Sequence, residues 1–157
     1  MAWDDYFDSA AQGICPSSDF EWYAVDCKGQ VAFLTSAGFG EVPLIVFRDK
    51  TAYYEAAESF KSLPIRGGHV LFARGSYDWS SWIKAACQGL FGYDWSASTG
   101  QYVPGQPYEL MATPEKPLIL ADLPVHVQEW VSPIRFEAEF GVVRELFPEQ
   151  QFRELNL

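Results

Sequence analysis

Two strand-like segments joined by a short turn sequence constrain the fold of this chain more than any other feature. Residues 21–26 and 31–35 are rich in aromatic and β-branched residues, which favour strands. Between them, Asp26 can accept a hydrogen bond at the first position of a turn, and Gly29 can adopt the positive φ that closes a hairpin loop. The sequence therefore predicts a β-hairpin, followed by a glycine-containing loop over residues 36–43.

Three segments carry the signals of helices. We expect Asp49 to cap a helix that runs to about Ser62, and Asp78 to cap a second helix that stops at Gly89. A short third helix is expected to begin at residues 122–124, where Pro124 costs no hydrogen bond. The first two segments carry apolar residues at helical spacing, namely Ala52, Tyr53, Ala56, Ala57 and Phe60 in one and Trp79, Trp82, Ile83, Ala86, Cys87 and Leu90 in the other.

Several further segments are predicted to be strands. Residues 69–73 and 90–95 are short and apolar, and residues 108–112 and 118–120 form either a hairpin or a strand and a crossover. Residues 134–140 alternate apolar and charged side chains, which is typical of a half-exposed antiparallel strand. The order of elements predicts an α+β fold with a mainly antiparallel sheet of about six or seven strands and about three or four helices.

The length of 157 residues is that of one domain with one core. We expect a single domain over residues 1–157, in which residues 1–18 form an N-terminal helix or arm and residues 149–157 fray. The N-terminus carries acids in place of the basic residues of a secretory signal, and no apolar run approaches the roughly 20 residues of a membrane span. These features predict a soluble protein of the cytoplasm.

The chain is acidic, with 21 Asp and Glu against 11 Lys and Arg and a net charge of −10. A negative field repels phosphate backbones and anionic lipids, which argues against nucleic acid and membranes as partners. It also speeds association with a basic protein. The alternative is that the charge serves solubility alone.

The sequence offers few groups for catalysis. Its histidines are His69 and His126, and its cysteines are Cys15, Cys27 and Cys87, with no CxxC pair. A pair of Cys15 or Cys87 with His69 stays open, but no local motif supports it. Zinc spacing, calcium loops, a P-loop and a dinucleotide fingerprint are all missing from the sequence. We therefore predict no catalytic residue, no metal and no cofactor.

Several motifs resemble those of a widespread bacterial family. Its members open with a W-[FY]-A-V-D-x-x-G-x-[VL]-A-x-F hairpin and a glycine-rich segment that ends in Val-Pro. The matching segments here are residues 22–33 and 37–43, and later Gly92-Tyr93-Asp94-Trp95, residues 107–110 and residues 117–124. Proteins of this kind are similar to immunity proteins of bacterial polymorphic-toxin and type VI secretion systems. The resemblance implies a non-catalytic protein that binds a cognate toxin and blocks its active site or functional surface.

The expected partner is thus a toxin protein, and its surface is expected to be basic. Acids and aromatics near irregular segments are the candidate contacts: Asp4, Asp5, Asp8, Glu21, Phe39, Asp78 and Asp94. Two alternatives stay open. One is a general protein-interaction domain without a toxin partner, and the other is a small hydrolase or transferase that uses Cys15 or a pair of acids.

Overall fold

The computed structural model describes residues 3–12, 19–73, 78–95, 103 and 105–148, and the side chains from residue 7 onward. Its helices are α1 (Trp3–Ala11), α2 (Lys50–Lys61), α3 (Ser80–Cys87) and α4 (Val125–Val131), with 3₁₀ turns η1 (Leu44–Phe47) and η2 (Leu120–Asp122). Its strands are β1 (Glu21–Val25), β2 (Val31–Thr35), β3 (His69–Leu71), β4 (Phe91–Trp95), β5 (Tyr108–Pro114) and β6 (Glu145–Leu146).

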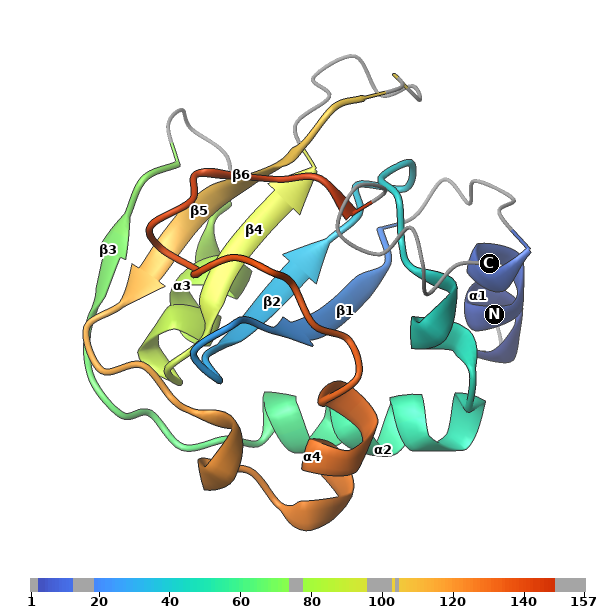
Figure 1. Cartoon of the computed structure of the whole chain (residues 1–157), viewed down its shortest axis with the longest axis horizontal. Helices are drawn as coiled ribbons and strands as arrows, with labels where there is room; N and C mark the ends of the chain where they lie inside the picture. Colours follow the sequence, from blue (N-terminus) through green and yellow to red (C-terminus); the bar gives the residue numbers. More distant parts are fainter. Residues whose placement is uncertain (1–2, 13–18, 74–77, 96–102, 104, 149–157) are drawn as a thin grey trace.

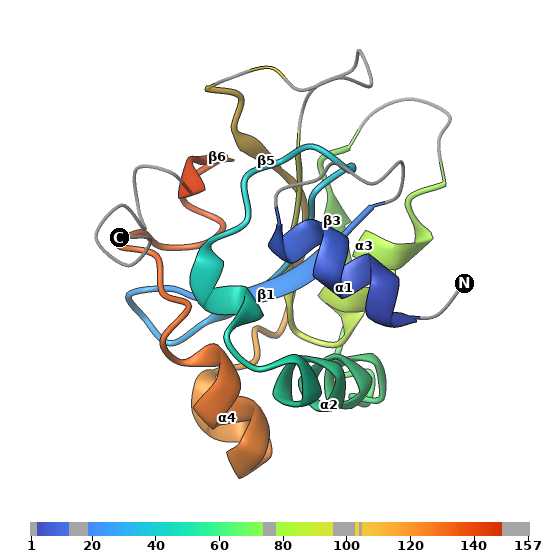
Figure 2. The same ribbon diagram turned by 90° about the vertical axis from the view of Figure 1, so that its right-hand side faces the viewer.

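These strands form one sheet in the order β1-β2-β4-β5-β3, with β6 paired to β5 as well. The β2–β4 pair is parallel and the other pairs are antiparallel. Helix α3 lies on one face of the sheet, and the chain that follows α4 crosses the opposite face (Figures 1 and 2). The predicted α+β class with a mainly antiparallel sheet is confirmed.

The predicted hairpin is present as β1 and β2, which pair in register from Glu21↔Thr35 to Val25↔Val31. Gly29 has a φ of +79° in the turn. The Asp26 carboxylate is fully buried and accepts four hydrogen bonds of 2.8–2.9 Å, from the backbone N–H groups of Lys28, Gln30 and Phe140 and from the Gln30 side chain. Asp26 therefore also holds the backbone at Phe140, which lies more than a hundred positions away in the sequence.

Helices α2 and α3 form in the predicted segments. The Asp49 side chain accepts a hydrogen bond of 3.0 Å from the Ala52 N–H at the start of α2, and Tyr53, Ala56, Ala57 and Phe60 are buried. At α3 the N-cap position is Trp79, which makes no side-chain cap hydrogen bond, so the prediction that Asp78 caps this helix is wrong. The Asp78 carboxylate, one residue earlier, accepts a hydrogen bond of 3.0 Å from the Ser80 N–H. Gly89 follows α3 with a φ of +99°, which favours glycine and ends the helix.

The prediction of a strand over residues 134–140 is wrong, although the alternation of burial is present. Ile134, Phe136 and Phe140 are buried, but residues 134–136 meet the sheet in an isolated bridge, Val25↔Arg135. Further along, Ala138 accepts from the Cys27 N–H, and the Phe140 N–H donates to Asp26. The segment bends around the hairpin turn, because the Asp26 carboxylate takes the place of a continuing strand partner.

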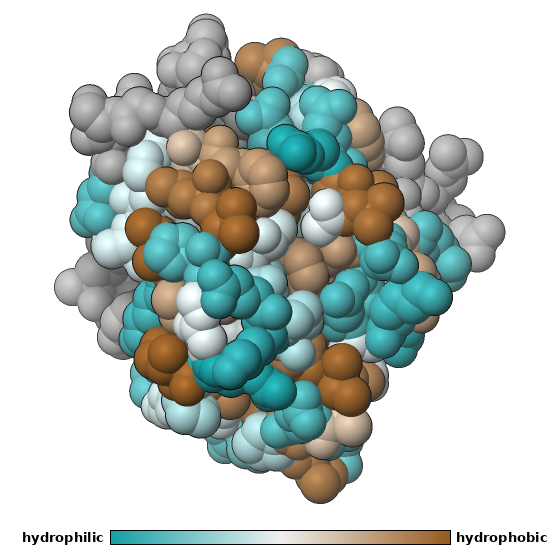
Figure 3. All heavy atoms as spheres, turned by 90° about the vertical axis from the view of Figure 1, so that its left-hand side faces the viewer, coloured by the Kyte–Doolittle hydropathy of each residue, from teal (hydrophilic) through white to brown (hydrophobic). Residues whose placement is uncertain are grey.

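Three smaller features also differ from the sequence-based expectations. Residues 118–120 form an isolated bridge and the start of η2, and make no hairpin with β5. The apolar segment 69–73 forms β3 over its first three residues, and β3 is an edge strand in which Val70 is 49% exposed and Leu71 is 37% exposed. Figure 3 shows that apolar groups on this side of the molecule are separated by hydrophilic ones. Strand β6 had no sequence signal, because it is only two residues long.

The core of the domain is aromatic on both faces of the sheet. On the α3 face, the Tyr23 ring stacks on Phe60 of α2 with centroids 3.9 Å apart. On the other face, the Trp22 Nε1 donates to the Tyr108 hydroxyl at 3.2 Å, and Phe136 packs against Trp22. This packing holds the sheet rigidly between its two layers.

Candidate functional site

A row of polar side chains crosses the sheet at one level. The strand registers pair Glu21 of β1 with Thr35 of β2, Thr35 with Asp94 of β4, Asp94 with Glu109 of β5, and Glu109 with Glu145 of β6. Partners in a strand register point to the same face of a sheet. Four carboxylates therefore share one face, and we call these five residues the acidic row.

Asp94 is the most perturbed member of this row. The pKa of its carboxyl is raised from 3.8 to about 6, mainly because of burial and to a smaller extent because of the charges of Asp19 and Glu109. The Thr35 hydroxyl opposes these effects by donating a hydrogen bond of 2.6 Å to Asp94 Oδ1. Asp94 thus changes its charge between about pH 5 and 7, which free aspartates do not.

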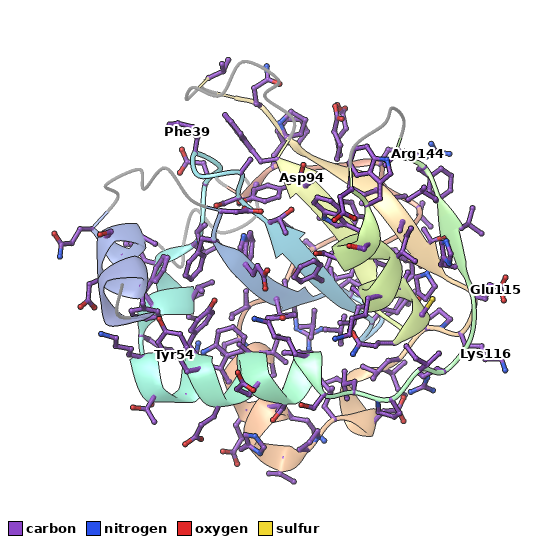
Figure 4. The ribbon with its side chains drawn as sticks, turned by 180° about the vertical axis from the view of Figure 1, so that it is seen from behind. Phe39, Tyr54, Asp94, Glu115, Lys116 and Arg144 are labelled. Carbon is purple, nitrogen blue, oxygen red and sulfur yellow. The ribbon has the colours of Figure 1, made fainter. Side chains whose placement is uncertain are left out.

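Helix α3 lies on the same face of the sheet as Asp94 and holds the hydrogen-bond partner of this carboxyl. The Trp82 Nε1 donates to Thr35 Oγ1 at 3.2 Å, so the hydroxyl accepts from Trp82 while it donates to Asp94. Trp82 can approach the sheet because Gly92 has no side chain, and a Cβ there would lie 3.1 Å from the indole. Figure 4 shows Asp94 close to one end of α3.

The carboxylate of Asp19 adds a further negative charge beside the row. Partial removal from water raises the pKa of this carboxyl, as does the charge of Glu21, although the Ala37 N–H donates to it at 2.6 Å and lowers the pKa. Glu21 itself forms an ion pair of 3.6 Å with Lys61 of α2. Glu109 and Glu145 are exposed at the other end of the row.

The spacing of the row decides what it can bind. Neighbouring strands lie about 4.8 Å apart, so the carboxylates lie in a line across the sheet and do not converge on a single point. Consistent with this, the described part of the chain contains no group of three or more His, Cys, Asp or Glu side chains that could hold a metal ion. A line of carboxylates suits an extended surface with several cationic side chains.

The structure brings only some of the sequence-predicted contact residues together. Glu21 and Asp94 belong to the acidic row. Phe39 lies on the loop after β2, toward the same end of the molecule as Asp94 in Figure 4, and its ring centroid is 6.2 Å from that of Trp95. The sequence-based reasoning missed Asp19, Glu109 and Glu145.

The remaining predicted residues lie elsewhere or have local roles. Asp8 of α1 pairs with Lys50 at 3.2 Å. Asp78 precedes the N-cap residue of α3, and its hydrogen bonds with Ser80 lower the pKa of the carboxyl. Asp4 and Asp5 are on α1, but their side chains lie outside the described part of the structure.

Two histidine contacts are relevant to the enzymatic alternative. The His69 Nδ1 lies 3.6 Å from the Cys87 Sγ, and both residues are half-buried. The His126 Nε2 lies 3.1 Å from the Ser59 hydroxyl on the exposed side of α2 and α4. Cys15 is outside the described residues, and Cys27 is a free, exposed thiol. Neither histidine has a further hydrogen bond within the described residues that would orient its ring.

Comparisons with protein-family models, with curated proteins and with solved structures give no match. Among the described helices, none has both the length and the apolar character that a bilayer crossing requires.

Proposed function

We propose that this protein is an immunity protein that binds a cognate bacterial toxin and covers its active site or functional surface. The observation that carries the proposal is the acidic row, in which Glu21, Asp94, Glu109 and Glu145 occupy one face in direct register across the sheet. Its complement is a toxin surface with lysine and arginine side chains. The protein would act in the cytoplasm, without nucleic acid, membrane or cofactor.

The repulsion between neighbouring carboxylates of the acidic row supports a role in binding. Like charges directly opposite one another destabilise a sheet, and Asp94↔Glu109 and Glu109↔Glu145 are both such pairs. A row that only served solubility would not need neighbouring acids on one face. Cationic side chains of a partner would remove this repulsion, so part of the binding free energy would come from relief within the sheet.

Asp94 gives the proposed interaction a pH dependence. Its pKa of about 6 means that a fraction of the free protein carries a protonated Asp94 near neutral pH. A cation placed beside the carboxyl favours its charged form and expels this proton. Binding should therefore strengthen as the pH rises from about 5 to 7.

One observation favours the enzymatic alternative, a small hydrolase or transferase. The distance of 3.6 Å between the Cys87 Sγ and the His69 Nδ1 is that of a nucleophile and its base. However, His69 has no further hydrogen bond within the described residues that would orient its ring, as the base of such a pair requires. We rank this alternative below binding.

A growth-rescue experiment tests the proposal. Cells express the toxin domain encoded next to this gene, together with this protein or with a variant. The double variant Glu109→Lys/Glu145→Lys reverses two exposed charges of the row and should lose rescue. The matched control Glu55→Lys/Glu129→Lys makes the same net change on α2 and α4, and should rescue as well as the unchanged protein. Failure of the unchanged protein to rescue would refute the immunity function, and equal loss in both variants would refute the role of the row.

A further inference from the structure

A small cleft opens between α2 and α3 on the α3 face of the sheet. It has a volume of about 150 Å³. Phe60 of α2 and Ala85 of α3 contribute to its walls, and Tyr23 and Phe33 of the neighbouring strands β1 and β2 contribute to its floor. A space of this size accommodates one six-membered ring. The aromatic lining favours a flat molecule, which can stack on the rings or meet their edges.

Two nearly buried polar side chains line the same cleft. Gln88 is 3% exposed, and its Nε2 donates to the carbonyl oxygens of Phe60, Lys61 and Leu63, at the end of α2. These bonds fix the amide and leave its Oε1 as an acceptor. Tyr23 is 2% exposed, and its hydroxyl has no hydrogen-bond partner within the described residues.

These two polar atoms reach the cleft. Within the described residues, the Trp130 Nε1 is the one fully buried side-chain nitrogen or oxygen that lacks a hydrogen-bond partner. The Tyr23 hydroxyl and the Gln88 Oε1 are therefore not sealed in the core, although both residues are almost completely buried. Burial also raises the pKa of Tyr23 well above 10.0, so its hydroxyl keeps its proton and can donate.

The charge of the cleft is opposite to that of the molecule. Two of the 11 basic residues, Lys61 and Lys84, line it, and Glu21 is the one acid that does. Lys61 pairs with Glu21, whereas Lys84 has no acidic partner within the described part of the chain. The cleft therefore offers an available ammonium group, a hydroxyl donor and an amide acceptor around an aromatic floor.

We propose that this cleft binds a small aromatic carboxylate with a single ring and a hydrogen-bond donor on that ring. The carboxylate accepts from the Lys84 ammonium and the Tyr23 hydroxyl, the ring packs on the aromatic lining, and the ring donor faces the Gln88 Oε1. Such a site goes beyond toxin binding and does not depend on it, since Glu21 is the one residue of the acidic row at its rim.

Titration with 4-hydroxybenzoate, followed by amide and aromatic NMR shifts of the full chain, tests the proposal. We expect saturable shifts at Tyr23, Phe33, Lys84 and Gln88. Benzoate lacks the ring donor and phenol lacks the carboxylate, so each should bind at least about fivefold more weakly, the effect of about one lost hydrogen bond. Cyclohexanecarboxylate, which is not planar, should not saturate the same shifts.

Two variants distinguish binding by Lys84 in the cleft from a general effect of the protein's charge. Lys84→Met keeps the length of the side chain and removes the ammonium, and should weaken binding by roughly five- to twentyfold. Lys28→Met removes the same charge from the exposed β1–β2 turn and should leave the affinity unchanged. The spectrum without ligand shows whether each variant is folded. The proposal is overturned if 4-hydroxybenzoate gives no saturable shifts, if the shifts map to another surface, or if both variants weaken binding equally. None of these outcomes would affect the growth-rescue result.

Discussion

The Thr35 hydroxyl donates a hydrogen bond of 2.6 Å to Asp94 Oδ1, and this contact joins the two central strands of the acidic row. Thr35 is 2% exposed and accepts from Trp82, and the Tyr93 carbonyl oxygen, at 3.3 Å, is a more distant acceptor for its hydroxyl than Asp94. One buried hydroxyl thus holds in place the carboxyl whose pKa is raised to about 6. The electrostatics of the acidic row can therefore be tested by changing Asp94 or its partner Thr35.

Asp94→Asn should stabilise the protein at pH 7. The folded state raises the pKa of the carboxyl from 3.8 to about 6, so ionisation of Asp94 opposes folding. This penalty is absent below about pH 4, grows between pH 4 and 6, and is complete above pH 6. The amide keeps the Thr35 hydrogen bond and carries no charge, so the free energy of unfolding should rise by roughly 1–3 kcal/mol at pH 7.

Denaturant unfolding at several pH values between 4 and 8 measures this effect. The stability gain of Asp94→Asn should disappear at pH 4. Glu129→Gln removes one negative charge from the exposed surface of α4 and serves as the control for net charge. A gain of the same size in both variants would mean that the effect is general repulsion and not the burial of Asp94.

Thr35→Val should raise the pKa of Asp94 above about 6. The Thr35 hydrogen bond lowers this pKa, and valine has the same shape without a hydroxyl. Thr35→Ser retains the hydroxyl and should leave the pKa close to that of the unchanged protein. A carboxyl-detected NMR titration of Asp94 in the three proteins provides the comparison. An unchanged pKa in Thr35→Val would show that the hydrogen bond does not tune the carboxyl.

The elements predicted correctly from sequence are those whose determinants are local. Asp49 and the apolar stripe from Tyr53 to Phe60 specify α2 within thirteen positions, and Gly29 specifies the hairpin turn. The strand prediction for residues 134–140 failed because the alternation of apolar and charged residues there reflects burial and not backbone pairing. Their real partner is the Asp26 turn, which lies too far away in the sequence for any local pattern to reveal.

The candidate site was only partly predictable for the same reason. Glu21 and Asp94 were identified as acids near aromatics, but their shared face depends on the parallel pairing of β2 with β4. Glu145 joins the row through a strand of two residues. Asp78 carries the same charge in the sequence, yet its carboxylate is hydrogen-bonded to the Ser80 N–H at the start of α3. The sequence identifies acidic residues as candidate contacts, but the strand register decides which of them share one face of the sheet.

Asp26→Asn should destabilise the fold strongly. The two carboxylate oxygens accept four hydrogen bonds between them, and the amide would place an NH₂ group against two donors. Loss of these bonds in a fully buried position should lower the free energy of unfolding by roughly 2–4 kcal/mol. Asp78→Asn is the matched control, because Asp78 is exposed and an asparagine Oδ1 accepts the same hydrogen bond from the Ser80 N–H. Equal stabilities of the two variants in denaturant would contradict the role assigned to Asp26.

Gly40→Ala should destabilise the protein by crowding the aromatic residues below the loop that carries Phe39. A Cβ at Gly40 would lie 2.7 Å from the Tyr108 hydroxyl and 2.8 Å from the Trp95 ring, both of which are buried. Neither ring has space to move, so we expect a loss of roughly 1–3 kcal/mol in the free energy of unfolding, measured by denaturant titration. Gly29→Asn is the control, since a Cβ there meets nothing within 4 Å and asparagine tolerates a positive φ. If Gly40→Ala is no less stable than this control, the close approach of Gly40 to Tyr108 and Trp95 does not constrain the loop.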